Sequence, residues 1–116
     1  DPSMSAEHRR NPRKRADVII QVTNAVTGET VGRIGNLSND GMMLVANRPV
    51  REDALYQFVF HLPDERGHPL PLEVGVHEQW SEPANVPGQF WAGFRFIDIG
   101  EHDQATLNRW LEQGGD

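Results

Sequence analysis

The sequence has no cysteine in its 116 residues, and this absence limits the chemistry open to the chain. Disulfide bonds, thiolate zinc sites and cysteine nucleophiles are all excluded. Long apolar runs are also missing, because none approaches the ~20 residues that a membrane-spanning helix needs. No signal-peptide pattern opens the chain. We therefore expect a cytoplasmic protein without a membrane span.

Lysine is almost absent, and the positive charge is unevenly placed. The chain carries 11 Lys+Arg against 17 Asp+Glu, for a formal net charge of −6, and all but one of these cations are arginine. Five of them lie within residues 9–15 (RRNPRKR), so 11 − 5 leaves six for the rest of the chain. Duplex DNA or RNA calls for a broad basic face. One arginine-rich segment suits a small anion instead, because guanidinium groups bind phosphate in a bidentate manner and stack on flat rings. The alternative is a solvated, disordered terminal arm.

Alternating and β-branched segments predict six strands, separated by turns or loops. The expected strands are residues 16–26, 30–37, 42–46, 55–62, 70–80 and 90–97. Side-chain alternation predicts that Val31, Arg33 and Leu37 share one face of the second strand. It also predicts a shared face of the fifth strand for Leu72, Val74, Val76 and Trp80.

Near the end of the chain, the spacing of the apolar residues changes from that of a strand to that of a helix. Leu107, Trp110 and Leu111 recur at helical spacing, which predicts a helix over residues 99–113, ended by the glycines at 114–115. Asp98 and Glu101 have the spacing of a capping box. Six strands and a helix predict an all-β fold, a six-stranded antiparallel β-barrel of the split or Greek-key kind with one C-terminal α-helix.

We expect two regions in the chain. Residues 1–15 should form a flexible basic arm, in which residues 1–3 resemble a cloning remnant before Met4. Residues 16–116 should form the barrel with its helix.

Motifs that would indicate an enzyme are missing. The five histidines show no HExxH spacing, and the chain has neither a GxSxG motif nor a P-loop. Glu73 and Glu78 would point to opposite faces of a regular strand, so they do not form a carboxylate pair. We expect no catalytic site, no metal and no cofactor.

Residues 36–41 (NLSNDG) are the second informative segment. Alone they predict a turn between two strands, in which Asn and Asp tolerate positive φ and Gly prefers it. Asn36 and Ser38 share parity at a strand end, so an amide and a hydroxyl can project toward one site. Gly41 would let the backbone approach a flat ligand. With the arginine segment, this patch suits a ligand that has phosphates and purine edges.

At these residues the chain resembles the PilZ domain family. Residues 9–13 match its RxxxR motif, with Arg9 and Arg13 as the two arginines and Arg10 as a common additional one. Residues 36–41 match its [D/N]xSxxG motif, and residues 91–99 (WAGFRFIDI) look like its sixth strand entering the C-terminal helix. The resemblance extends from about residue 7 to residue 111.

The resemblance implies a barrel that binds the bacterial second messenger cyclic di-GMP. The arginines would embrace the phosphates and contact guanine, while the second motif would hold the other guanine against the barrel. The implied binding residues are Arg9, Arg10, Arg13, Asn36, Ser38 and Gly41. Trp80 is a candidate for the aromatic residue that some members stack on the ligand, or it belongs to the core or covers the barrel rim. Asn36 departs from the commoner aspartate, keeping a carbonyl acceptor but losing the charge.

Three functional hypotheses follow. The first is a stand-alone cyclic di-GMP receptor that passes the signal to an unidentified effector protein. The second is a PilZ-like adaptor without a ligand, but such members usually lack the arginines that this chain keeps. The third is a binder of single-stranded nucleic acid. It would need cations spread over a sheet face, so we expect no nucleic-acid polymer as a partner.

Overall fold

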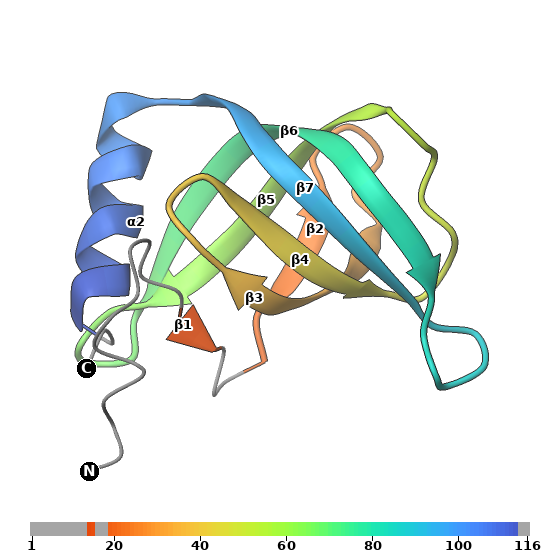
Figure 1. Ribbon diagram of the computed structural model, residues 1–116. Coiled ribbons are helices and arrows are strands. Elements are labelled where there is room, and N and C mark those ends of the chain that lie inside the picture. Colours follow the sequence, from red (N-terminus) through yellow and green to blue (C-terminus); the bar gives the residue numbers. More distant parts are fainter. Residues whose placement is uncertain (1–13, 16–18, 114–116) are drawn as a thin grey trace, which may run out of the picture.

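The computed structural model describes residues 14–15 and 19–113 (Figure 1). Arg9, Arg10 and Arg13, the start of the first expected strand and the terminal glycines lie outside the described residues. The elements are β1 (Lys14–Arg15), β2 (Gln21–Asn24), β3 (Thr30–Leu37), β4 (Gly41–Ala46), β5 (Leu55–Pro63), β6 (Pro69–Pro83), β7 (Phe90–Ile99) and α2 (Glu101–Gln113).

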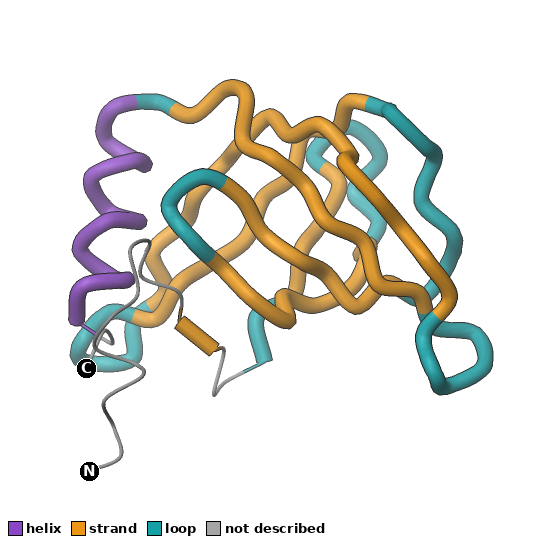
Figure 2. The backbone as a smooth tube through the Cα atoms, in the orientation of Figure 1, coloured by secondary structure: helices purple, strands orange, loops and turns teal. Residues whose placement is uncertain are grey.

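Strands β2 to β7 close into an antiparallel barrel. Their order is β3-β2-β5-β6-β7-β4, and pairing between β3 and β4 closes the ring. Figure 2 shows these strands surrounding one interior, with the helix α2 at one end. The predicted six-stranded barrel with a C-terminal helix is confirmed, although the first strand, β2, is shorter than expected. The two residues of β1 extend the sheet along β3, where Lys14 pairs with Leu37 and Arg15 with Asn36.

The core consists of inward-facing side chains from the strands and one face of α2. Phe58 and Phe60 of β5 are fully buried, as is Leu107 of the helix. Trp110 is only 5% exposed, so it packs into the core and is not left open to a partner. Each such side chain contributes about 1.5–3 kcal/mol through burial. This packing fixes α2 against the barrel.

Two β-bulges overturn the simple alternation expected for β3 and β6. In β3, Ile34 pairs with Leu44 and Asn36 with Met43, so Gly35 is an extra residue. The prediction that Val31, Arg33 and Leu37 share a face is therefore wrong, since Arg33 is exposed whereas Leu37 is buried. A bulge adds one residue to a strand and reverses the direction of the side chains that follow.

The second bulge lies in β6 and redirects Trp80. Glu78 pairs with Phe94 and Trp80 with Gly93, so Gln79 is the extra residue. Leu72, Val74 and Val76 face the core as predicted. Trp80 does not share their face, because the bulge turns its side chain to the outside of the barrel. The bulge thereby creates an exposed aromatic surface.

The predicted capping box is also wrong. Asp98 lies within β7, where it pairs with Gly75, and the helix starts at Glu101. The amide of Gln104 donates to the carbonyl of Gly100 at 2.8 Å, so Gly100 occupies the position before the first helical turn. Strand pairing of Asp98 prevails over its capping propensity.

Candidate ligand-binding site

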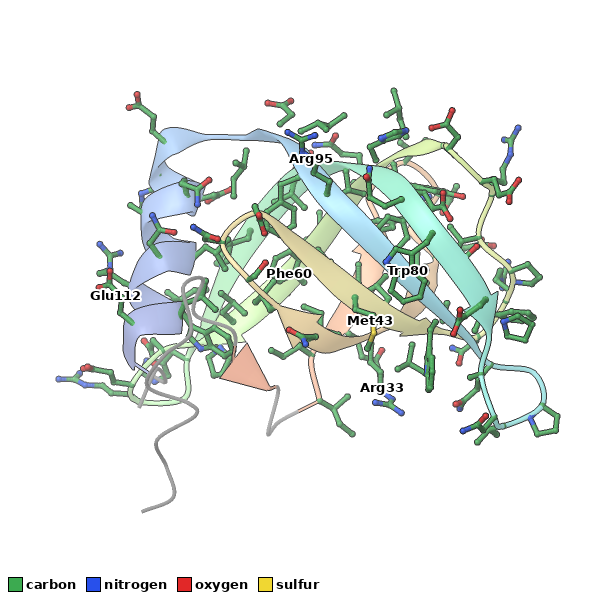
Figure 3. The ribbon with its side chains drawn as sticks, viewed as in Figure 1. Arg33, Met43, Phe60, Trp80, Arg95 and Glu112 are labelled. Carbon is green, nitrogen blue, oxygen red and sulfur yellow. The ribbon has the colours of Figure 1, made fainter. Side chains whose placement is uncertain are left out.

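A pocket of about 260 Å³ lies on the outer wall of the barrel, beside the turn between β3 and β4. Figure 3 shows Trp80, which belongs to β6, beside β7, with Arg95 farther along β7 and Met43 on β4 below them. The pocket brings together four of the predicted site residues, Asn36, Ser38, Gly41 and Trp80. Its lining is Asn36, Ser38, Asp40, Gly41, Met42, Met43, Gln79, Trp80, Gly93, Phe94 and Arg95.

The β3–β4 turn is held by its own polar groups. The amide of Ser38 donates to the carbonyl of Gly41 at 2.9 Å, and its hydroxyl donates to Asp40 Oδ1 at 2.7 Å. The same hydroxyl lies 3.2 Å from the carbonyl of Gly41. Ser38 is only 5% exposed. Its first role is therefore to fix the turn that forms one end of the pocket.

Gly41 is required by the neighbouring strand and not by the turn conformation. Asn39, Asp40 and Gly41 all lack the positive φ expected from the sequence. A Cβ on Gly41 would instead lie 2.4 Å from the backbone oxygen of Phe94. Glycine at this position thus allows β4 to approach β7.

Trp80 covers Gly93 of the adjacent strand. A Cβ on Gly93 would lie 2.2 Å from Nε1 of the indole, so the ring rests on the space that a side chain would occupy. Trp80 is 44% exposed, which excludes the core alternative. The indole forms a flat aromatic wall of the pocket.

The segment before Trp80 is hydrogen-bonded to the loop between β4 and β5. The amide of Asp53 donates to Glu78 Oε1 at 2.7 Å, and the amide of Glu78 donates to the carbonyl of Ala54 at 2.9 Å. His77 Nε2 is hydrogen-bonded to the carboxylate of Asp53. Asp53 has a φ of 58°, a backbone conformation that costs energy and needs such support. These bonds hold the bulge that presents Trp80.

The arginine segment ends beside this pocket. Lys14 and Arg15 pair with Leu37 and Asn36, the latter lining the pocket. Arg9, Arg10 and Arg13 themselves lie outside the described residues. Strand β1 thus connects the two predicted motifs, a link that sequence reasoning did not identify because β1 is only two residues long.

Asp40 and Arg95 are pocket residues that sequence reasoning missed. In the sequence, Asp40 has the features of an ordinary turn residue and Arg95 those of an exposed strand residue. Only the pairing of β4 with β7 brings the two positions together. In the described part of the chain, Arg95 forms no ion pair. Its guanidinium is available to an anion or to a polar ligand edge.

A second hollow, of about 380 Å³, lies between α2 and the loop connecting β5 to β6. Arg66, Arg109 and Trp110 contribute to its lining, but none of the predicted site residues does. Within residues 14–15 and 19–113, no group of three or more His, Asp or Glu is arranged to hold a metal ion. Among the same residues, no helix is long and apolar enough to cross a membrane.

Three solved structures share this fold. The Bacillus subtilis inhibitor of motility MotI/DgrA superposes with a TM-score of 0.74 at 16% identity, over 91% of this chain and 50% of that one. The PilZ domain of YcgR from Escherichia coli, solved with cyclic di-GMP, gives 0.68 at 17% identity over 92% and 91%. The K. pneumonia MrkH complex with cyclic di-GMP gives 0.66 at 18% identity over 90% and 51%.

This chain spans about half the length of the MotI and MrkH chains. No curated protein sequence matches it. The family model described as the PilZ domain matches residues 7–113, which include both predicted motifs, the whole barrel and the helix. The chain therefore belongs to the PilZ domain family.

Proposed function

We propose that this protein is a receptor for cyclic di-GMP and not an enzyme, and that it passes the signal to a partner protein. The observation that carries the proposal is the gathering of Asn36, Ser38, Gly41 and Trp80 around one pocket, next to which the arginine segment ends. Two structures of the same fold, those of YcgR and MrkH, contain this ligand.

Each part of the site suits one part of the ligand. Arg9, Arg10 and Arg13 supply guanidinium groups for the two phosphates, where charge-assisted hydrogen bonds contribute about 1.5–3 kcal/mol each. The Trp80 indole offers a face on which a guanine can stack. Asn36 supplies an amide that both donates and accepts hydrogen bonds. The described pocket has a single cation, Arg95, so most of the phosphate binding falls to the arginine segment.

Calorimetric titration with cyclic di-GMP, GTP and a single-stranded oligonucleotide tests the proposal. We expect saturable one-site or two-site binding of cyclic di-GMP and much weaker binding of the other two. Preference for the oligonucleotide would favour the hypothesis of a single-stranded nucleic-acid binder. If none of the three ligands binds, the hypothesis of an adaptor without a ligand is favoured.

We propose that a partner protein reads the ligand-bound surface of this domain. Trp110 is buried, so the outer surface of α2 is a weaker candidate for a ligand-controlled interface than the arginine segment. Ligand binding would neutralise part of that segment's charge and hold Arg9, Arg10 and Arg13 at the pocket, which creates a composite face of arginine segment, ligand and barrel. A partner captured equally well with and without cyclic di-GMP would instead identify a constitutive adaptor.

Trp80→Ala should weaken cyclic di-GMP binding roughly 10-fold, because stacking on an aromatic side chain contributes ~1–3 kcal/mol per base. The thermal unfolding temperature should change little, since the indole is partly exposed and lies outside the core. Trp80→Phe, which keeps a smaller ring, serves as the matched control and should retain most of the affinity. Equal affinity in the alanine variant and the wild type would show that the indole only covers the barrel wall.

Asn36→Ala and Ser38→Ala should differ in their effect on folding. Asn36 is half-buried, so its loss should lower affinity about 5-fold at little cost in stability. Ser38→Ala removes the bond to Asp40 and should also lower the free energy of unfolding by about 1 kcal/mol. Urea denaturation without ligand, followed by calorimetry, separates the two effects. A larger loss of stability in Asn36→Ala than in Ser38→Ala would contradict this assignment.

A further inference from the structure

The pocket carries one negative and one positive side chain that neither sequence motif accounts for. Among the described residues that line it, Asp40 is the only carboxylate and Arg95 the only cation. Their backbones are adjacent, because Gly41 pairs with Arg95 and the amide of Phe96 donates to the carbonyl of Asp40 at 2.9 Å. Both side chains are exposed. They form no ion pair with each other, so each is available to a ligand.

Asp40 is held in a defined orientation. The Ser38 hydroxyl donates to Asp40 Oδ1 at 2.7 Å, which restrains this carboxylate oxygen beside the turn. A carboxylate has about four lone-pair positions, so it can still accept two further hydrogen bonds. It is therefore prepared for a ligand edge with two adjacent donors.

The spacing along β7 relates this pair to the aromatic wall. Trp80 rests on Gly93, and Arg95 lies two residues farther along the same face of the strand. Two residues of a strand span about 7 Å. A purine that stacks on the Trp80 indole would thus direct its edges toward Arg95 and Asp40.

We propose that Asp40 and Arg95 hold one guanine of the ligand by its two polar edges and make the pocket selective for guanine. Guanine presents two donors, the N1–H and the N2 amino group, which match a carboxylate. It presents two acceptors, O6 and N7, which match a guanidinium. Adenine has an amino group at position 6 and an acceptor at N1, so it would oppose both side chains. This inference rests on the proposed function and names the residues that read the base.

The proposal also explains how the chain accommodates Asn36. The neutral amide at position 36 supplies no negative charge, whereas Asp40, four residues later, supplies a carboxylate in the same pocket. Charge-assisted bonds to the base are thereby kept although position 36 is uncharged.

Calorimetry with two ligands tests the proposal. The ligands are cyclic di-GMP and its di-inosine analogue, which lacks the N2 amino group but keeps N1–H, O6 and N7. The variants are Asp40→Asn and Arg95→Gln, and the matched controls are Asp98→Asn on β7 and Arg109→Gln on α2, both exposed and outside the pocket. Thermal unfolding verifies that each variant is folded.

The wild type should prefer cyclic di-GMP over the analogue by roughly 10-fold, because one hydrogen bond to a charged group is lost. Asp40→Asn should reduce this preference to about 3-fold or less. Arg95→Gln should lower the affinity for both ligands by roughly 10-fold and leave the preference between them unchanged. The two controls should behave as the wild type does.

Two results would overturn the proposal. They are a wild-type preference near unity and a preference in Asp40→Asn that equals that of the wild type. Equal weakening of both ligands in Asp40→Asn gives the second result and would show that the carboxylate orients the arginine segment instead. A wild-type preference near unity overturns the proposal even if a variant fails to fold. Failure of the wild type to bind cyclic di-GMP at all would refute the proposed function itself, which is a different outcome.

Discussion

Arg13→Ala should lower the affinity for cyclic di-GMP by roughly 100-fold or more, as expected for the loss of two charge-assisted hydrogen bonds of ~1.5–3 kcal/mol each. Arg13 directly precedes Lys14, whose backbone pairs with Leu37 at the edge of the pocket. Consecutive Cα atoms are about 3.8 Å apart, so Arg13 is the motif arginine most closely anchored to the site.

Arg66→Ala is the matched control for this variant. Arg66 is an exposed arginine on the loop between β5 and β6, and it lines the other hollow. Arg66→Ala should leave the affinity for cyclic di-GMP unchanged. A heat of binding in Arg13→Ala equal to that of the wild type would show that Arg13 does not contact the ligand.

Gly41→Ala should lower the free energy of unfolding by about 2 kcal/mol or more, because the added methyl group meets backbone that cannot rotate away. The Cβ would lie 2.4 Å from the backbone oxygen of Phe94, so β4 and β7 must separate beside the pocket. Ligand affinity should fall as a consequence. Urea denaturation followed by calorimetry measures both quantities.

Gly35→Ala is the control for Gly41→Ala. The Cβ on Gly35 would meet the terminal methyl group of Met43 at 2.7 Å, and this flexible end can move aside. Gly35→Ala should therefore lower the free energy of unfolding by less than Gly41→Ala does. If Gly41→Ala loses ligand affinity without losing stability, the glycine serves the ligand and not the contact between strands.

Side-chain alternation was sufficient to predict the barrel. Segments such as residues 55–62 alternate clearly, and Phe58, Phe60 and Leu62 are indeed fully buried. The helical spacing of Leu107, Trp110 and Leu111 likewise predicted the face that packs into the core. These patterns depend on local geometry, which the sequence records directly.

The bulges could not be predicted in this way. Gln79 carries no local signal, and a glycine within a strand, such as Gly35, often marks a bulge but does not fix one, because a bulge depends on how one strand aligns with its neighbour. The consequence for the site is large, since the bulge at Gln79 decides that Trp80 faces the ligand pocket and not the core. For the same reason the sequence did not reveal that Asp40 and Arg95 line one pocket.

The motif residues were identifiable from their match to the PilZ motifs, because residues 36–41 alone predict only a turn. Their roles were less evident. Ser38 was expected to face a ligand, but it is buried and bonded to Asp40. Gly41 was expected to permit a turn, but it permits the contact with Phe94. The participation of Arg9, Arg10 and Arg13 stays a prediction, since they lie outside the described residues.

The most direct test of the account is a titration with cyclic di-GMP followed by two-dimensional NMR of the backbone amides and tryptophan indoles. We expect the largest shifts in residues 36–41 and at the Trp80 indole N–H, because these groups form the pocket. The indole N–H of Trp110, which is buried beside the second hollow, should not move. Saturation with the ligand that leaves the Trp80 signal unchanged, or that shifts Trp110 and residues 64–70 instead, would contradict the account.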